Sequence, residues 1–184
     1  MPPWSRVVSP GPETYGGDVK SLDVLGVRVQ MPTNQPIVLL RERDGSRYLP
    51  IWIGAAEAAA IAYAQQGVVP PRPLTHDLLK NVLEELGHTI DRVRITALDS
   101  GVFHATIDVD GGADGGGRSI DSRSTDAIAL ALRAGVDIVT DDAMLDEAGV
   151  EMAGEQEEDE VEKFKEFLDH VSADDFDTGD QPSS

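Results

Sequence analysis

The sequence contains no cysteine among its 184 residues. This absence excludes disulfide bonds and thiolate metal sites. No apolar run approaches the roughly 18 residues that a membrane-spanning helix needs, and the N-terminal residues lack the basic and apolar regions of a signal peptide. We therefore expect a cytoplasmic protein without a membrane partner.

Basic residues are also scarce. The chain has 15 Lys and Arg against 34 Asp and Glu, a net charge of −19, and residues 151–184 alone hold 13 acidic and 2 basic side chains. Nucleic-acid binding normally depends on a basic surface that releases counterions from phosphates. The charge therefore argues against passive, high-affinity DNA binding, but it leaves room for a small local basic site.

The length fits one folded domain. Residues 1–18 are rich in Pro, Gly and Ser and show no hydrophobic period, which predicts a disordered leader. We place the folded domain at residues 19–150 and a solvated acidic linker at 151–160. Apolar residues recur at helical spacing in 161–176, which predicts a C-terminal helix, and residues 177–184 form a disordered tail.

Runs of apolar residues predict hairpins of strands interleaved with single helices. Asp44-Gly45 and Asp99-Ser100-Gly101 mark hairpin turns, and Pro50 should lie at a sheet edge or bulge. Expected strands cover 22–29 with a bulge at Gly26, 36–42, 47–53, 91–98, 102–109 and 136–140. Expected helices cover 55–66, a segment from N-cap Thr75 to Gly87, and a short one capped by Asp141 or Asp142. This order predicts an α+β fold with a mixed, largely antiparallel sheet packed by three or four helices.

The stretch from residue 118 to 135 places charged residues directly before an apolar segment. It should run from a strand ending near Asp121 into a buried helix that Gly135 stops with a left-handed residue. Between Ala127 and Ala134 only Arg133 is charged, so this helix has little polar face. We expect Asp121, Arg123 and Asp126 to lie together at the strand-to-helix junction, where functional groups often collect.

Four sequence runs together resemble the bifunctional nuclease domain family. They are PIVLLRE at 36–42, YLPIWIG at 48–54 followed by Glu57, RPLTHDLL at 72–79, and DSRSTDAIALA at 121–131. The likeness covers about residues 19–149, and the C-terminal helix is similar to an extension found in many bacterial members. One departure is Arg123-Ser124-Thr125-Asp126, where the family pattern has Arg-Pro-Ser-Asp or Arg-Ala-Ser-Asp; the swap keeps both Arg and Asp.

The resemblance implies an α+β domain that forms homodimers, and a nuclease name taken from plant members described as cutting DNA and RNA. It implies no catalytic assignment. A nuclease needs a base or metal to prepare water, and cations to hold the developing charge. The candidate catalytic residues are Glu57, His76, Asp77, Asp121 and Asp126. The candidate substrate-binding residues are Arg72, Arg123, Arg133, Arg41 and Arg43, because arginine clamps phosphate bidentately.

Carboxylates suit Mg²⁺ or Mn²⁺, so one of these is the expected cofactor, with its ligands unassigned and no other cofactor implied. Any cleavage should then depend on the metal and on carboxylates rather than on His76 alone. His88, His104 and His170 are dispersed and suggest no metal site.

A structural interpretation of the same residues stays open. Asp77 and Asp126 in first helical turns would stabilise the helix dipole, and Asp121 could form an internal ion pair with Arg123 or Arg133. Arg41 with Arg43, and Arg92 with Arg94, alternate along strands, so each pair could form a local basic stripe or a solvated sheet face balanced by Glu42 and Asp91. Two hypotheses follow: metal-assisted phosphodiester hydrolysis of DNA or RNA, and a non-catalytic homodimeric binding or regulatory module. Convergent carboxylates beside a cleft would favour the enzyme, and a packed, ion-paired Asp121 group the module.

Overall fold

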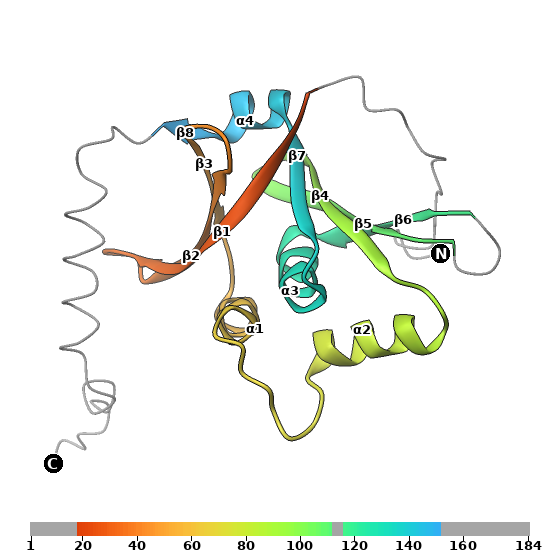
Figure 1. The fold of residues 1–184 in the computed structure, drawn as a ribbon. Coiled ribbons are helices and arrows are strands. Elements are labelled where there is room, and N and C mark those ends of the chain that lie inside the picture. Colours follow the sequence, from red (N-terminus) through yellow and green to blue (C-terminus); the bar gives the residue numbers. More distant parts are fainter. Residues whose placement is uncertain (1–17, 112–115, 152–184) are drawn as a thin grey trace, which may run out of the picture. The chain divides into compact units, whose positions relative to one another are not determined.

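The computed structural model describes residues 18–111 and 116–151. This part of the chain forms eight strands and four helices, which confirms the α+β prediction (Figure 1). Their bounds are β1 Val19–Gln30, β2 Gln35–Glu42, β3 Arg47–Trp52, α1 Ala55–Gln65, α2 Thr75–Glu85, β4 Ile90–Asp99, β5 Val102–Val109, β6 Arg118–Arg123, α3 Ser124–Ala134, β7 Asp137–Asp141, α4 Asp142–Ala148 and β8 Val150–Glu151.

All eight strands form one sheet in the order β6-β5-β4-β7-β1-β2-β3-β8. Strands β1, β2 and β3 form one antiparallel unit, and β4, β5 and β6 form another. Strand β7 lies between the two units, antiparallel to β1 and parallel to β4. The sheet is therefore mixed and largely antiparallel, as predicted.

The hairpins follow the turn chemistry of the sequence. Ser100 and Gly101 between β4 and β5 both have positive φ, 51° and 81°, as a type I′ turn requires. The pairing of β1 with β2 shifts register between Val24 and Gly26, which confirms the predicted bulge. Pro50 lies beyond the two residues of β3 that β8 covers, so its missing N–H faces the open edge of the sheet.

Helix α3 is the buried centre of the domain. Its residues Ala127, Ile128, Ala129, Leu130 and Ala131 are each at most 1% exposed, and Gly135 ends the helix with φ of 69°. Small alanines allow close approach of neighbouring elements, and α3 packs on β4 and β5 while α1 packs on β1 and β2. The predicted buried helix is confirmed.

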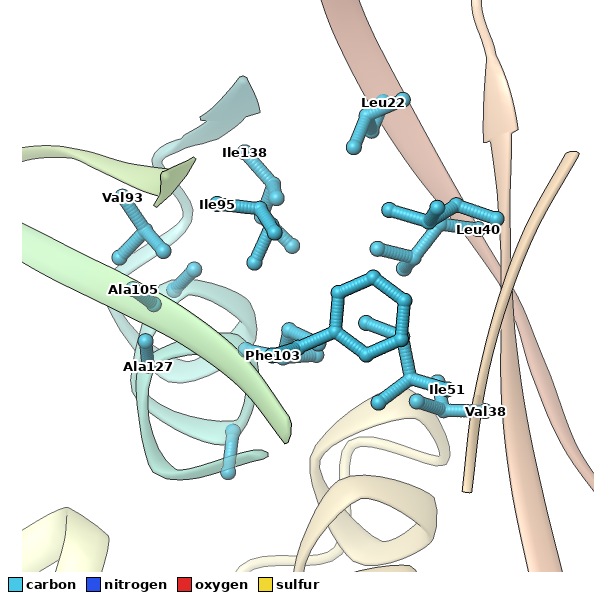
Figure 2. Close-up of a cluster of buried hydrophobic side chains, with 14 of the residues drawn as sticks. Leu22, Val38, Leu40, Ile51, Val93, Ile95, Phe103, Ala105, Ala127 and Ile138 are labelled. Carbon is cyan, nitrogen blue, oxygen red and sulfur yellow. The ribbon is translucent and has the colours of Figure 1, made fainter. Parts of the chain in front are cut away.

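One hydrophobic cluster joins the two antiparallel units. Figure 2 shows the ring of Phe103 on β5 between side chains of β4 and α3, such as Ile95 and Ala127, and side chains of β2 and β3, such as Val38 and Ile51. Burial of these side chains is the main stabilising contribution, at about 1.5 to 3 kcal/mol for each large one.

An ion-pair cluster around the buried Glu42 fixes α4 to the β2–β3 hairpin. Glu42 is 6% exposed and accepts two hydrogen bonds from Arg47, at 2.8 and 2.9 Å. Arg47 also donates to Asp142 at 2.6 Å and Asp146 at 2.7 Å. The helix begins as predicted, since the Asp141 side chain accepts the Met144 N–H at 2.7 Å.

Three local predictions need correction. Thr75 is the first helical residue of α2 rather than its N-cap, and the N-cap position belongs to Leu74. The strand before α3 continues to Arg123 instead of ending at Asp121. Glu151, predicted to lie in the acidic linker, belongs to strand β8 and pairs there with Arg47 of β3. The predicted leader, C-terminal helix and tail lie outside the described residues, apart from Asp18.

No helix in the described ranges is long and apolar enough to cross a membrane.

Candidate functional site

The candidate site begins where β6 passes into α3. Arg123 ends the strand and holds the N-cap position of the helix, and Asp126 follows in the first helical turn. The Arg123 Nε donates to Asp126 Oδ2 at 2.6 Å, and Nη2 donates to Oδ1 at 3.0 Å. This two-pronged pairing is the strong form of an arginine–carboxylate interaction, and it fixes one edge of the guanidinium group.

Helix α1 brings Glu57 to the same guanidinium group. Arg123 Nη1 donates to Glu57 Oε1 at 3.0 Å. The side chain of Arg123 is nevertheless 65% exposed, against 24% for Glu57. Arg123 therefore presents a solvent-accessible positive charge while two carboxylates hold its orientation.

Helix α2 brings His76 to Asp126. The His76 Nε2 lies 3.0 Å from Asp126 Oδ1, and the His76 side chain is 15% exposed. In the tautomer with the proton on Nε2, this nitrogen donates to the carboxylate and Nδ1 carries a free lone pair. A histidine oriented by a carboxylate in this way can act as a base.

Asp77 and Arg133 fasten α2 to α3 beside the site. Arg133 Nε donates to Asp77 Oδ1 at 2.6 Å, and Arg133 Nη1 donates to the Ala129 carbonyl at 2.8 Å. The other Asp77 oxygen, Oδ2, accepts the Leu74 N–H at 2.9 Å. The Arg133 side chain is only 7% exposed. Both residues thus hold helices in place, and the structure does not set them beside Arg123.

The ion pairs shift the pKa values of the site residues. Burial raises the pKa of Asp126, but hydrogen bonds from Arg123 and His76 outweigh burial and leave this pKa below its usual value. For Asp77, burial is likewise outweighed by the Leu74 N–H and by Arg133, so its pKa is lowered. The hydrogen bond to Asp126 raises the pKa of Arg123. Both carboxylates are therefore charged at neutral pH.

Asp121 is not part of this cluster. It is exposed and pairs with Thr106 of β5 in the sheet register. Asp121 has the same strand parity as Ser119, whose hydroxyl bonds to Arg94 and Asp108, so it projects from the sheet face opposite the core. Arg123 does not follow the alternation of side chains along β6, because the backbone turns into α3 at this residue. The predicted group of three residues is assembled only for Arg123 and Asp126.

The remaining candidate arginines lie elsewhere. Arg43 is 3.0 Å from Asp23 and 3.2 Å from Asp137, and Arg41 is 4.0 Å from Asp23. Asp23 and Asp137 therefore balance Arg41 and Arg43, in place of the expected Glu42 and Asp91. Arg72 is exposed in the segment before α2.

The described residues do not form a ready metal site. Among them no three His, Asp or Glu side chains come together as a metal ion would require. Two carboxylates of the cluster, Glu57 and Asp126, both bond to Arg123, and a divalent cation between them would be repelled by the guanidinium group. We therefore derive no step through a metal, and the expectation of Mg²⁺ or Mn²⁺ stays a prediction.

The pairings of His76 with Asp126 and of Asp77 with Arg133 were absent from the sequence interpretation. Each joins the first turn of α2 to α3, and strands β4, β5 and β6 lie between these two helices in the sequence. The available signal was the His76-Asp77 dipeptide at a helix start, which offers two adjacent polar groups on the side that a neighbouring helix contacts.

Comparison with known proteins gives a consistent result. The family model described as the bifunctional nuclease domain matches residues 38–153. Two proteins of Mycobacterium tuberculosis, the uncharacterized protein Rv1829 of strain H37Rv and the uncharacterized protein MT1877 of strain CDC 1551, are each 51% identical over 161 residues. Each match covers 83% of this chain and 95% of the relative.

Proposed function

The chain belongs to the bifunctional nuclease domain family, and from this membership we propose that it hydrolyses phosphodiester bonds of DNA or RNA at the site of Glu57, His76, Arg123 and Asp126. The observation that carries the proposal is the 3.0 Å contact of His76 with Asp126 beside the exposed Arg123. This arrangement combines an oriented base with a cation, the two elements that phosphodiester cleavage needs.

In the proposed reaction, His76 Nδ1 accepts the proton of the attacking water, or of the ribose 2′-hydroxyl in RNA. A new phosphorus–oxygen bond forms as the bond to the leaving oxygen breaks, and that oxygen takes a proton from the imidazolium or from water. Asp126 stabilises the imidazolium because it is charged and 3.0 Å away. Base catalysis of this kind contributes about 10² to 10⁴ in rate.

Arg123 would hold the phosphate. Its bidentate bonds to Asp126 occupy Nε and Nη2, while Nη1 bonds to Glu57 through one contact. A substrate phosphate would replace the Glu57 contact on Nη1 and leave the Asp126 pair intact. Because the chain carries a net charge of −19, few further phosphate contacts are expected, and binding should show a shallow dependence on salt.

Divalent metal is a separate part of the proposal. Mg²⁺ is often held by one or two carboxylates together with substrate phosphates rather than by a preformed protein cage. Such binding would also reduce the repulsion between an acidic protein and a polyanion. An assay with and without EDTA decides this point independently of the role of His76.

The test is cleavage of end-labelled DNA and RNA, each single- and double-stranded, in Mg²⁺, Mn²⁺ or EDTA. The proteins are the wild type, Asp126→Asn, and Asp91→Asn as a matched carboxylate-to-amide control at an exposed position of β4. We expect cleavage by the wild type and the control and its loss in Asp126→Asn. Equal cleavage by all three proteins would indicate a contaminant or a different site.

A non-catalytic binding or regulatory module is the second candidate. One observation favours it: Arg123, Asp126, Asp77 and Arg133 are all engaged in ion pairs with one another or with Glu57, and His76 forms a hydrogen bond with Asp126, as in structural networks. Absence of cleavage on every substrate and metal, with the fold intact, would select this candidate.

The proposed activity would be exercised in the cytoplasm, where the substrates are available. Immunodetection in fractionated cells tests that location.

A further inference from the structure

Strand β3 ends in Trp52, a large aromatic residue on the outer face of the sheet, which is the face turned away from the hydrophobic cluster. Side chains alternate along the strand, and Leu49 and Ile51 belong to the cluster, so Trp52 points to the other side. Trp52 is 55% exposed. A tryptophan that is fully packed buries roughly 150 to 250 Å², so on the order of 100 Å² of this residue stays open to a ligand.

A hydrogen bond holds the indole ring of Trp52 along the sheet. Its Nε1 donates to Gln30 Oε1 of β1 at 2.8 Å, although β2 lies between β3 and β1. Adjacent strands are about 4.8 Å apart, so the two side chains together cross the outer surface of β2 beside Ile37, the register partner of Trp52. The ring therefore lies across the strand, with one face toward the sheet and the other toward solvent.

The outer face around Trp52 is basic, in contrast to the chain as a whole. Arg28 of β1 is opposite Ile37, which places Trp52, Ile37 and Arg28 in one row across three strands. Along β1, β2 and β3, the described charged side chains on this face are three arginines and one aspartate: Arg28, Arg41, Arg43 and Asp23. Asp137 of β7 adds a second aspartate beside Arg43. The face is thus a local exception in a chain with a net charge of −19.

We propose that Trp52 is a stacking site for an unpaired nucleobase, and that the substrate of the nuclease reaction proposed above, on which this inference rests, is single-stranded. A nucleobase is flat and matches one face of an indole ring, and Arg28 in the same row meets the phosphate that the base carries. In a duplex the base faces are covered by their neighbours, so only an unpaired base can stack on a side chain. A protein partner would need about 800 Å² on each side, far more than one ring offers.

Stacking also provides affinity that an acidic protein otherwise lacks. Binding of nucleic acid without sequence preference normally comes from many phosphate contacts, and the net charge of −19 opposes these. One base stacked on an aromatic side chain strengthens binding by about 10- to 100-fold, whatever the net charge of the protein. Binding to this chain should therefore depend strongly on the presence of bases.

A short piece of chain connects Trp52 to the candidate catalytic site. Strand β3 leads directly into α1 (Figure 1), and Glu57 in the first turn of α1 accepts a hydrogen bond from Arg123 at 3.0 Å. Trp52 and Glu57 are five residues apart in the sequence, so their Cα atoms lie at most about 18 Å from one another. One strand of nucleic acid would thus contact Trp52 with a base and Arg123 with a phosphate a few nucleotides away.

Tryptophan fluorescence of the full chain tests the stacking site. The sequence has two tryptophans, Trp4 and Trp52, so the Trp4→Phe variant reports on Trp52 alone. The probes are a short single-stranded oligothymidylate, an abasic strand of the same length, and a duplex. We expect the oligothymidylate to quench the emission of Trp52, and the abasic strand and the duplex to leave it unchanged, because stacking needs an accessible base.

Affinity for the labelled oligothymidylate, measured by fluorescence polarisation, provides the second measurement. Trp52→Ala should weaken binding by about 10- to 100-fold, while Trp52→Phe, which keeps an aromatic face, should lose less. The matched control is Tyr63→Ala, which removes an aromatic residue that is 47% exposed on α1 and should bind like the wild type. Because Trp52 is exposed, these variants should keep the wild-type melting temperature.

Binding and cleavage separate this inference from the proposed function. Binding that depends on Trp52, without cleavage of any substrate, would overturn the nuclease proposal and leave the stacking site in place. Cleavage with equal affinity in Trp52→Ala and the wild type would overturn the stacking site alone. The stacking site would also be overturned by an equal response to the abasic strand, by tighter binding of the duplex, or by Trp52 emission that no probe changes.

Discussion

His76 of α2 and Asp126 of α3 are fifty residues apart in sequence, yet His76 Nε2 lies 3.0 Å from Asp126 Oδ1. Their contact joins the least buried helix of the described domain to its most buried one. It is also the feature on which the proposed chemistry depends, because the carboxylate sets the orientation of the imidazole ring.

Changing His76 to Ala should reduce kcat/KM for nucleic-acid cleavage by about 10² to 10⁴, since the base is lost. Asp126→Asn should lower kcat by a similar order because the amide does not stabilise the imidazolium. Initial rates on the best substrate measure both effects. By contrast, Asp121→Asn should have little effect, because Asp121 projects from the other face of the sheet; a loss equal to that of Asp126→Asn would place the reacting group elsewhere.

Arg133→Met should destabilise the domain by about 1 to 3 kcal/mol. The methionine keeps the apolar stem but leaves Asp77 without its partner, and a partly buried carboxylate then lacks compensation. Urea unfolding followed by circular dichroism gives the change. Arg72→Met, at an exposed position, is the control and should leave the unfolding midpoint where it is. An unchanged midpoint in Arg133→Met would show that the pair contributes nothing to stability.

Stability should decline as the pH falls below about 4, the usual pKa of an aspartate in an unfolded chain. The pKa values of Asp77 and Asp126 are lowered in the folded state. The stabilisation that each provides is therefore complete above the unfolded pKa and is lost as the pH falls through the lowered folded pKa. The urea unfolding midpoint, measured between pH 7 and 2.5, should fall less steeply with pH in Asp77→Asn than in the wild type. Asp91→Asn should show the same dependence as the wild type. Parallel profiles for both variants would contradict the assignment.

Ala131→Glu should prevent folding. Ala131 is fully buried on α3, and an unpaired carboxylate in that position costs several kcal/mol. Ala59→Glu on the exposed side of α1 is the matched control and should melt like the wild type. Thermal melting distinguishes the two, and a cooperative transition at the wild-type temperature in Ala131→Glu would mean that α3 is not the centre of the core.

Local sequence signals were sufficient for most of the strands and helices. Strand β5 has the predicted bounds of Val102 to Val109. The helix end at Gly135 and the β-bulge at Gly26 also lie where glycine at these positions predicted them. Such features depend on a few neighbouring residues. The two-residue strand β8 was missed because Val150 and Glu151 carry no periodic pattern of their own.

Features that depend on distant partners could not be predicted in the same way. The apolar spacing of Leu79, Val82, Leu83 and Leu86 predicted a helix but not which side it would turn to the domain. That choice is made by His76 and Asp77 with residues fifty or more positions away. The grouping of Asp121 with Asp126 failed for a related reason. Nearness in sequence at the end of a strand does not fix the sheet face, which the alternation of side chains decides.

The central position of β7 in the sheet sets an order of events for folding. The units β1-β2-β3 and β4-β5-β6 are each continuous in sequence and can form by local pairing, whereas β7 follows both and joins them through β1 and β4. Long-range closure of this kind is slow compared with hairpin formation. A nascent chain that ends before Asp137 thus holds two half-sheets, in which β1 and β4 are edge strands that β7 has not yet covered. Until β7 forms, the backbone groups of β1 and β4 that it will bind can pair with other chains, in addition to those of β3 and β6.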